Sequence, residues 1–274
     1  MTISDKERAY IEIYKGNDDK SVRKIYPDIP EGTEWYYATD LSYNNVNHFL
    51  NFIADPDSVP FDKVSLYHIE DMVEMVKALI HVSCEYALER PQPKEILYRF
   101  ENSRNIPSYE KGELPSLKST SKSSSESTVF DYQNAVALAF KTEGFCPFLS
   151  VDDVIDGGVF SDEKEILFPP FIKVQLTDDY SYTRSGDFQI VKVKDDFKEE
   201  GYIDKNQLEE LYIDTMKNIE KTYYRDRKNK EVSEELSNQT FVIYNYLREY
   251  ARNMFREYKQ KYEQKHQKEA EKQY

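Results

Sequence analysis

The chain has 274 residues, of which 51 are acidic and 37 are basic, and its formal net charge at pH 7 is -14. Hydrophobic residues make up 39% of the sequence, so the chain can bury a core and is not a disordered protein. Counterion release at a phosphate backbone needs clustered Lys and Arg, so the acidic balance argues against a nucleic-acid-binding protein.

The two cysteines, Cys84 and Cys146, lie far apart in apolar surroundings, which indicates buried free thiols in a reducing compartment. The histidines lack the spacing with cysteine or carboxylate partners that a metal site needs, so we expect no metal. The charged N-terminus has no apolar leader core, and no stretch is long enough to span a membrane. We therefore expect a cytoplasmic protein without membrane contact, or an effector delivered into a host cell without a conventional signal peptide.

The first half of the chain mixes helical patterns with short strands. We expect residues 1–60 to form small helices and loops. Apolar residues recur at three- and four-residue steps from Ile69 to Ala87, which predicts a core-facing helix over 61–90 that ends before Pro91. A strand over 95–100, a polar loop over 101–113 and a strand over 114–120 follow.

The second half begins with a serine-rich tract and ends in helices. We predict, in chain order, a helix over 132–141, strands over 145–151, 163–174 and 188–193, and helices over 205–227 and from 233 onward. A loop over 152–162 precedes the second of these strands, and its Gly157-Gly158 pair permits positive φ angles. The charged end of the last helix is either a solvated helix end or a partner-binding surface within residues 233–274.

Three short motifs carry residues that could perform chemistry. Glu163 and Glu165 are two apart at the start of a strand, so both carboxylates point to one face. Ser119-Thr120-Ser121 could end a strand with hydroxyls that hold a carboxylate or contact a ligand. Arg99 in the strand before them could bind phosphates. Taken singly, each motif is poor evidence: the glutamates could be an exposed strand start, the serine-rich tract is better explained as a flexible linker, and Arg99 could be an ordinary surface arginine.

In this order, the motifs resemble the arginine-serine-glutamate branch of the ADP-ribosyltransferase family. The matching segments are Leu97-Tyr98-Arg99, Ser119-Thr120-Ser121 and Glu163-Lys164-Glu165, continued by Ile166-Leu167-Phe168-Pro169-Pro170. Phe100 stands where the family usually has glycine. The resemblance covers about residues 65–195.

The resemblance implies an α+β fold with a pair of packed, mostly antiparallel sheets, flanking helices and a helical C-terminal extension. The chain then divides into an N-terminal helical and loop region over 1–60, a catalytic domain over 61–200 and the extension over 201–274.

By the same resemblance, the protein cleaves NAD as its substrate and transfers ADP-ribose to an acceptor protein. Glu165 stabilises the oxocarbenium-like transition state, Ser119 orients it, and Arg99 binds the NAD phosphates. Thr120 and Ser121 shape the nicotinamide pocket. The remaining two residues, Glu163 and Phe160, contact the acceptor, and a glutamate at 163 indicates an arginine acceptor.

Three alternatives remain open at the sequence level. Water could replace the acceptor in an NAD glycohydrolase, or the acceptor could be a nucleic-acid base. The third alternative is an inactive transferase-like scaffold that binds a partner through its C-terminal helices.

Overall fold

A computed structural model of the chain describes residues 3–15, 19–28, 41–125, 134–155, 165–197 and 204–271. The chain folds into two compact units, each assembled from segments that are distant in the sequence. One unit, mainly Ile80–Lys198 and Arg252–Tyr274, contains the sheet, and the other, Ile3–Leu79 and Glu199–Ala251, is helical. The division at residues 60 and 200 stays a prediction.

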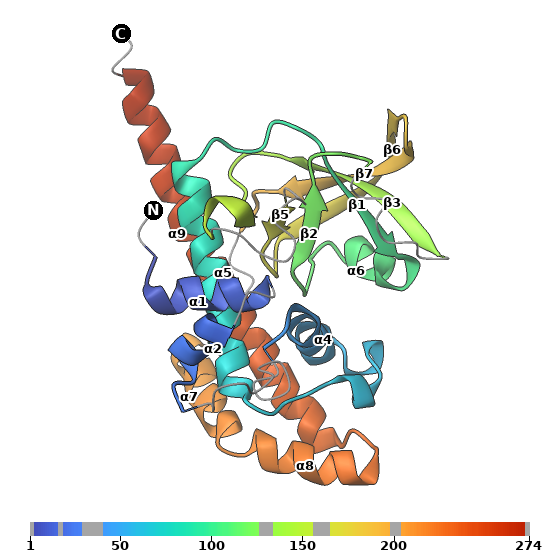
Figure 1. Cartoon of the computed structure of the whole chain (residues 1–274), viewed down its shortest axis with the longest axis vertical. Coiled ribbons are helices and arrows are strands. Elements are labelled where there is room, and N and C mark those ends of the chain that lie inside the picture. Colours follow the sequence, from blue (N-terminus) through green and yellow to red (C-terminus); the bar gives the residue numbers. More distant parts are fainter. Residues whose placement is uncertain are drawn as a thin grey trace. The chain divides into compact units, whose positions relative to one another are not determined.

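The helical unit confirms that the N-terminal region and the residues after 204 form helices (Figure 1). Ser4 begins the first helix with a capping box, in which its hydroxyl accepts a hydrogen bond from the Glu7 amide and the Glu7 carboxylate accepts one from the Ser4 amide. The helices are α1 (Asp5–Tyr14), α2 (Asp19–Ile25), α4 (Tyr43–Ala54), α7 (Lys205–Met216) and α8 (Ile219–Asn229), with parts of α5 (Ile69–Glu89) and α9 (Glu234–Glu271).

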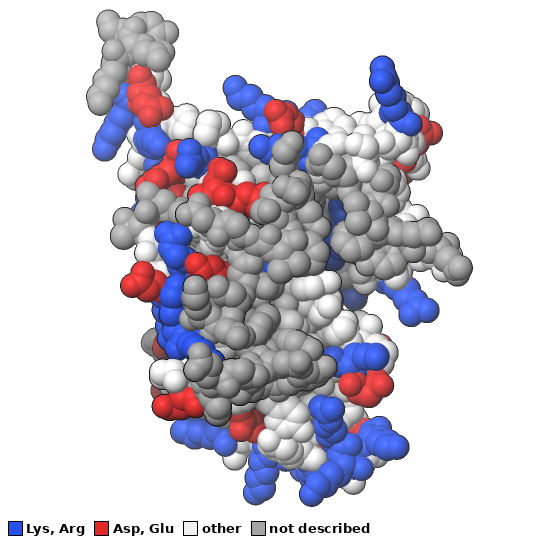
Figure 2. All heavy atoms as spheres, viewed as in Figure 1, with Lys and Arg blue, Asp and Glu red and all other residues white. Residues whose placement is uncertain are grey.

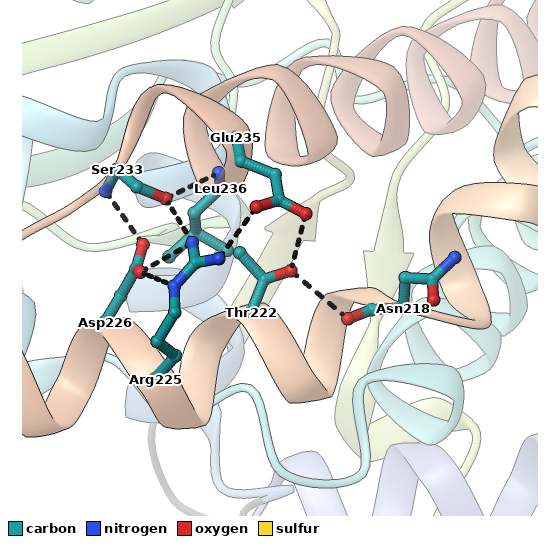
Figure 3. A network of polar contacts seen from close by, with 7 residues as sticks. All are labelled: Asn218, Thr222, Arg225, Asp226, Ser233, Glu235 and Leu236. Atoms are coloured by element: carbon teal, nitrogen blue, oxygen red, sulfur yellow. Dashed lines mark hydrogen bonds and ion pairs between the residues drawn. The ribbon is translucent and has the colours of Figure 1, made fainter.

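A buried carboxylate fixes the corner between α8 and α9 (Figure 3). The Asp226 carboxylate accepts a hydrogen bond from the Ser233 amide at 2.7 Å and two from the guanidinium of Arg225. Arg225 also reaches Glu235 in the first turn of α9 at 2.8 Å. The Ser233 hydroxyl accepts a hydrogen bond from the Leu236 amide, which satisfies one of the unpaired donors at the start of α9.

The sheet unit contains seven strands in the order β4-β5-β2-β1-β3-β7-β6 (Figure 1). All neighbouring pairs are antiparallel except β3 and β7, which run parallel. The strands are β1 (Leu97–Asn102), β2 (Lys118–Ser121), β3 (Ala135–Thr142), β4 (Leu149–Ser150), β5 (Glu165–Phe168), β6 (Lys173–Thr183) and β7 (Gly186–Lys194).

The α+β class is confirmed, but the described strands form one hydrogen-bonded sheet instead of the expected two. β1 pairs with β3 along its whole length, whereas it meets β2 only where Tyr98 lies opposite Ser121. The half β4-β5-β2 and the half β1-β3-β7-β6 are therefore joined at a single residue pair. Arg99 and the serine motif lie on the two strands of this junction, and Glu165 lies on the next strand, β5.

The helix predicted over 132–141 is wrong, because residues from Ala135 to Thr142 form the strand β3. β3 lies between β1 and β7 in the sheet, and Leu138, Ala139 and Phe140 are all buried. A strand covered on both faces carries a continuous apolar run, which periodicity alone does not distinguish from a buried helix segment.

The other predicted elements differ from the observed ones mainly in where they begin and end. The polar loop expected over 101–113 contains a short helix, α6 (Ile106–Glu110), and the strand expected over 145–151 shrinks to Leu149–Ser150. The strand expected over 163–174 is two strands, β5 and β6, separated by buried Pro169 and Pro170. The helix expected over 61–90 begins at Ile69 and ends at Glu89, just before Pro91.

The face shown in Figure 2 carries Lys and Arg side chains as well as Asp and Glu side chains. Cys84 and Cys146 are buried free thiols, as expected, and burial raises the pKa of both. In the part of the chain that the structure describes, no helix is both long and apolar enough to cross a membrane.

Candidate active site

Three neighbouring strands, β1, β2 and β5, carry the described residues of the three motifs. β2 and β5 pair antiparallel, with Ser121 opposite Glu165 and Ser119 opposite Leu167. Tyr98 of β1 lies opposite Ser121 on the other side of β2. Residues that face each other in an antiparallel ladder share one face of the sheet, so Tyr98, Ser121 and Glu165 form a row across three strands.

Glu165 is the first residue of β5 and is only 6% exposed. A carboxylate in so shielded a place acts strongly on any charge that develops beside it. Its cross-strand neighbour is Ser121, whereas Ser119, to which the family resemblance assigns the orienting role, lies two residues earlier along β2. The register therefore adds Ser121 as a candidate for the residue that orients Glu165.

The guanidinium of Arg99 is held by two acceptors. Its Nε donates to Oε2 of Glu101 at 3.0 Å, and its Nη1 donates to the carbonyl oxygen of Ser119 at 2.8 Å. Arg99 follows Tyr98 in β1, so its side chain leaves the strand on the face opposite to Tyr98. Bonds from two nitrogens of a planar group fix its orientation, here against the backbone of the serine motif.

Thr120 has a structural contact of its own. Its hydroxyl donates to the carbonyl oxygen of Ile166 at 2.8 Å, and the side chain is buried between β2 and β5. This bond ties the two strands together, and a role for Thr120 in binding NAD stays a prediction.

The two residues expected to meet the acceptor, Glu163 and Phe160, lie outside the described residues, as does most of the loop over 152–162. Their expected roles stay predictions.

Glu101 is the centre of a buried polar cluster that the sequence analysis missed. Only 1% of Glu101 is exposed. Its Oε2 accepts hydrogen bonds from Arg99 Nε, from Lys118 Nζ at 3.0 Å and from the Tyr109 hydroxyl at 2.8 Å, and its Oε1 accepts one from Asn105 at 2.7 Å. The available signal was the spacing of Arg99 and Glu101, which places both on one face of a strand.

The cluster keeps Glu101 ionised. Burial by itself raises the pKa of this carboxyl, but the charges of Arg99 and Lys118 and the hydrogen bonds lower it well below its usual range. Burial lowers the pKa of Lys118, and the charge on Glu101 opposes that effect. Burial likewise raises the pKa of the Tyr109 hydroxyl, so it remains a donor at neutral pH. The buried Glu101 carboxylate therefore balances the charges of both Arg99 and Lys118.

A separate cavity of about 470 Å³ lies in the same unit and is lined by none of the motif residues. Its walls include Gln92, Lys141, Tyr262 and His266. Within the described ranges, no group of three or more His, Cys, Asp or Glu side chains is placed to hold a metal ion.

No protein-family model matches the sequence, and no curated protein matches it. Among solved structures, the chain aligns with the ADP-ribosyltransferase HopU1 of Pseudomonas syringae pv. Tomato DC3000 at 14% identity and a TM-score of 0.36, over 71% of this chain and 98% of that one. It also aligns with Vis toxin, an ADP-ribosyltransferase from Vibrio splendidus, at 17% identity and a TM-score of 0.32, over 70% and 87% of the two chains. Exoenzyme S from Pseudomonas aeruginosa aligns at 12% identity and a TM-score of 0.36, over 75% and 96%. These TM-scores are too low to carry an argument about function, which therefore rests on the residues of β1, β2 and β5.

Proposed function

We propose that the protein is a mono-ADP-ribosyltransferase that cleaves NAD and transfers ADP-ribose to an arginine of an acceptor protein. One observation carries the proposal: Glu165 lies directly across from Ser121, and the guanidinium of Arg99 lies against the backbone of the same serine motif. A carboxylate and a hydroxyl that are distant in sequence thus share one face of β5 and β2, and the guanidinium of Arg99, whose side chain leaves β1 on the other face, bonds the backbone of the same serine motif.

In the proposed reaction, the bond between the nicotinamide nitrogen and ribose C1′ breaks, and its electron pair leaves with nicotinamide. Positive charge then develops on the ribose ring. Glu165 would stabilise this charge through a hydrogen bond with the ribose 2′-hydroxyl, an interaction that is stronger in the transition state than in the ground state. A guanidinium nitrogen of the acceptor would attack C1′ and lose a proton.

Arg99 would bind the NAD phosphates, because a guanidinium presents planar donors that match phosphate oxygens. Its orientation would depend on Glu101, which accepts the hydrogen bond from Nε. The resemblance assigns the orientation of Glu165 to Ser119 and the nicotinamide pocket to Ser121. The register instead favours Ser121 as the residue that would hold the Glu165 carboxylate, with Ser119 in contact with the ligand.

Glu163 would receive the acceptor. A carboxylate can bind a guanidinium and help remove its proton, which the high pKa of arginine otherwise disfavours. Phe160 would contact the acceptor from the same loop. We further propose that the protein works in a reducing cytosol, its own or that of a host cell.

The test is NAD turnover and transfer by the purified protein. Wild type should release nicotinamide and label the guanidino compound agmatine from labelled NAD. Glu165→Gln should lower both rates at least about a hundredfold, whereas Glu110→Gln, at an exposed glutamate of α6, should leave them unchanged. If wild type releases no nicotinamide and labels no guanidino acceptor, the proposal fails.

Glu163→Gln separates transfer from hydrolysis. If Glu163 selects the acceptor, the variant should keep nicotinamide release and lose agmatine labelling. Equal loss of both rates would contradict the arginine-selecting role.

A second candidate function, an inactive scaffold, has one observation in its favour. Arg99 already bonds Glu101 and Ser119 within the protein, as a purely structural arginine would. NAD binding measured by calorimetry distinguishes the two, since a scaffold of this kind would not bind NAD.

A further inference from the structure

The hairpin of β6 and β7 lies at the edge of the sheet (Figure 1). It carries exposed tyrosine and aspartate side chains. Tyr180 is 48% exposed and Tyr182 is 77% exposed. Asp187 lies opposite Tyr182 in the ladder, and Asp178 and Asp179 are exposed just before Tyr180. We call these five residues the hairpin surface.

The two tyrosines are not part of the core. Between them, Ser181 lies opposite Phe188, which is fully buried and packs against the rings of Tyr98 and Phe100. Side chains alternate along a strand, so Tyr180 and Tyr182 point away from the face that Phe188 covers. Exposed aromatic rings on a strand edge are typical of binding surfaces.

Hydrogen bonds hold the hairpin in one conformation. The ladder is irregular between Leu176 and Tyr180. There the Thr177 hydroxyl donates to the carbonyl oxygen of Ile190 at 2.9 Å, and the side-chain Nε2 of Gln189 donates to the carbonyl oxygen of Thr177 at 2.7 Å. At the turn, the Thr183 hydroxyl donates to the carbonyl oxygen of Gly186 at 3.0 Å. A partner that binds here would meet a surface that is already ordered, which lowers the entropy cost of binding.

The chemistry of the hairpin surface favours a guanidinium. Between Thr177 and Phe188 the sequence holds three aspartates, Asp178, Asp179 and Asp187, and one basic residue, Arg184, so this part of the hairpin is acidic. Tyrosine rings attract cations over their faces, and carboxylates form paired hydrogen bonds with guanidinium groups. Arginine can use both contacts at once, and lysine gains less from either.

The turn of the hairpin lies close to the end of β2. Ser124 donates a hydrogen bond to the hydroxyl of Ser185 in the turn at 3.3 Å. Ser124 is three residues after Ser121, so at most roughly 11 Å of backbone separates them. The turn of the hairpin thus lies near the end of β2, whereas Tyr180 and Tyr182 point to the face of the sheet opposite Glu165, so an acceptor that meets both sites passes over the turn.

We propose that the hairpin surface is an exosite for the acceptor protein. The hairpin surface binds an arginine-rich segment of the acceptor, next to the arginine that is modified. This inference rests on the proposed transferase function and adds to it where the acceptor docks. The surface selects protein acceptors by their neighbouring arginines, and it takes no part in the cleavage of NAD.

The test compares a large acceptor with a small one. In a Tyr180→Ala/Tyr182→Ala variant, the KM for a short peptide of alternating glycine and arginine should rise about five- to thirtyfold, as expected for two lost cation–π contacts. The KM for agmatine and the rate of NAD hydrolysis should stay within about twofold, because agmatine is too small to reach both sites. Phe241→Ala, at a 59% exposed aromatic of α9, is the matched control and should change nothing.

Direct binding of the labelled peptide, measured by fluorescence anisotropy, does not depend on catalysis. Wild type should bind the arginine peptide more tightly than the matching lysine peptide, and the double variant should lose that preference. An unchanged arginine preference in the double variant would overturn the exosite even if transfer is confirmed. A change in oligomeric state caused by the double variant would also overturn it, because the surface would then bind a second copy of this chain. A wild type that binds the peptide but never cleaves NAD would overturn the proposed function alone.

Discussion

Arg99 donates a hydrogen bond from its Nε to Oε2 of Glu101 at 3.0 Å, and Lys118 donates to the same oxygen at the same distance. Two cations from two strands therefore depend on one buried carboxylate. Removing one partner of a buried ion pair leaves an uncompensated charge, which is more costly than losing a surface pair. This relationship links the stability of the sheet to the orientation of the proposed phosphate-binding arginine.

Glu101→Gln should both destabilise the fold and weaken NAD binding. The neutral side chain keeps the shape but leaves Arg99 and Lys118 without their counter-charge, so the free energy of unfolding should fall by about 3 kcal/mol. The KM for NAD should rise because the Arg99 guanidinium is no longer fixed, while kcat changes less. Urea unfolding and nicotinamide-release kinetics measure the two effects.

Lys118→Met is the matched control for that variant. It should also lower the free energy of unfolding, since it removes a hydrogen bond from the same cluster, but it keeps the bond between Arg99 and Glu101. The KM for NAD should therefore stay near the wild-type value. Equal rises in KM for both variants would indicate general loosening of the site and would contradict a positioning role for Glu101.

The stability contributed by Glu101 should depend on pH in one direction. Its pKa is lowered in the folded state, so the carboxyl binds fewer protons when folded than when unfolded. The contribution is complete above the ordinary pKa of 4.5 and is lost as the pH falls below that value towards the folded pKa. The difference in unfolding free energy between wild type and Glu101→Gln should shrink as the pH is lowered from about 6 to 3. A difference that stays constant over this range would show that the charge of Glu101 is not what stabilises the fold.

The two serines of the motif should differ in their effect on turnover. Ser121 lies directly across from Glu165, and Ser119 lies across from Leu167. If the register decides which hydroxyl holds the carboxylate, Ser121→Ala should lower kcat for nicotinamide release by about tenfold, the cost of one hydrogen bond of about 1.4 kcal/mol. Ser119→Ala should then act mainly on KM. The opposite order would favour the role that the family resemblance gives to Ser119.

Asp226→Asn should destabilise the helical unit. The buried carboxylate receives the Ser233 amide and the Arg225 guanidinium at the corner between α8 and α9. The loss of a charged acceptor at a helix start should lower the free energy of unfolding by about 1–3 kcal/mol. Glu235→Gln, which removes a half-exposed partner of Arg225, should cost less than about 0.5 kcal/mol. Thermal unfolding followed by circular dichroism compares the two, and similar costs would show that the buried carboxylate has no special role.

The sequence by itself determined the elements whose side chains repeat regularly and the order of the motifs. The three- and four-residue spacing in α5 and the apolar run of β7 require no distant partner to be recognised, and both are confirmed. Alternation along a strand also places Arg99 and Glu101 on one face. The positions of Arg99, Ser119 and Glu165 on strands follow from the same local patterns.

Only the tertiary structure decided which strands lie side by side, because pairing depends on contacts between residues that are far apart in the chain. It made β3 a central strand where its apolar run had suggested a helix, and it placed Ser121 across from Glu165. It also buried Glu101 with Lys118 and left Tyr182 exposed, since a residue's burial is set by what packs over it and not by its own identity.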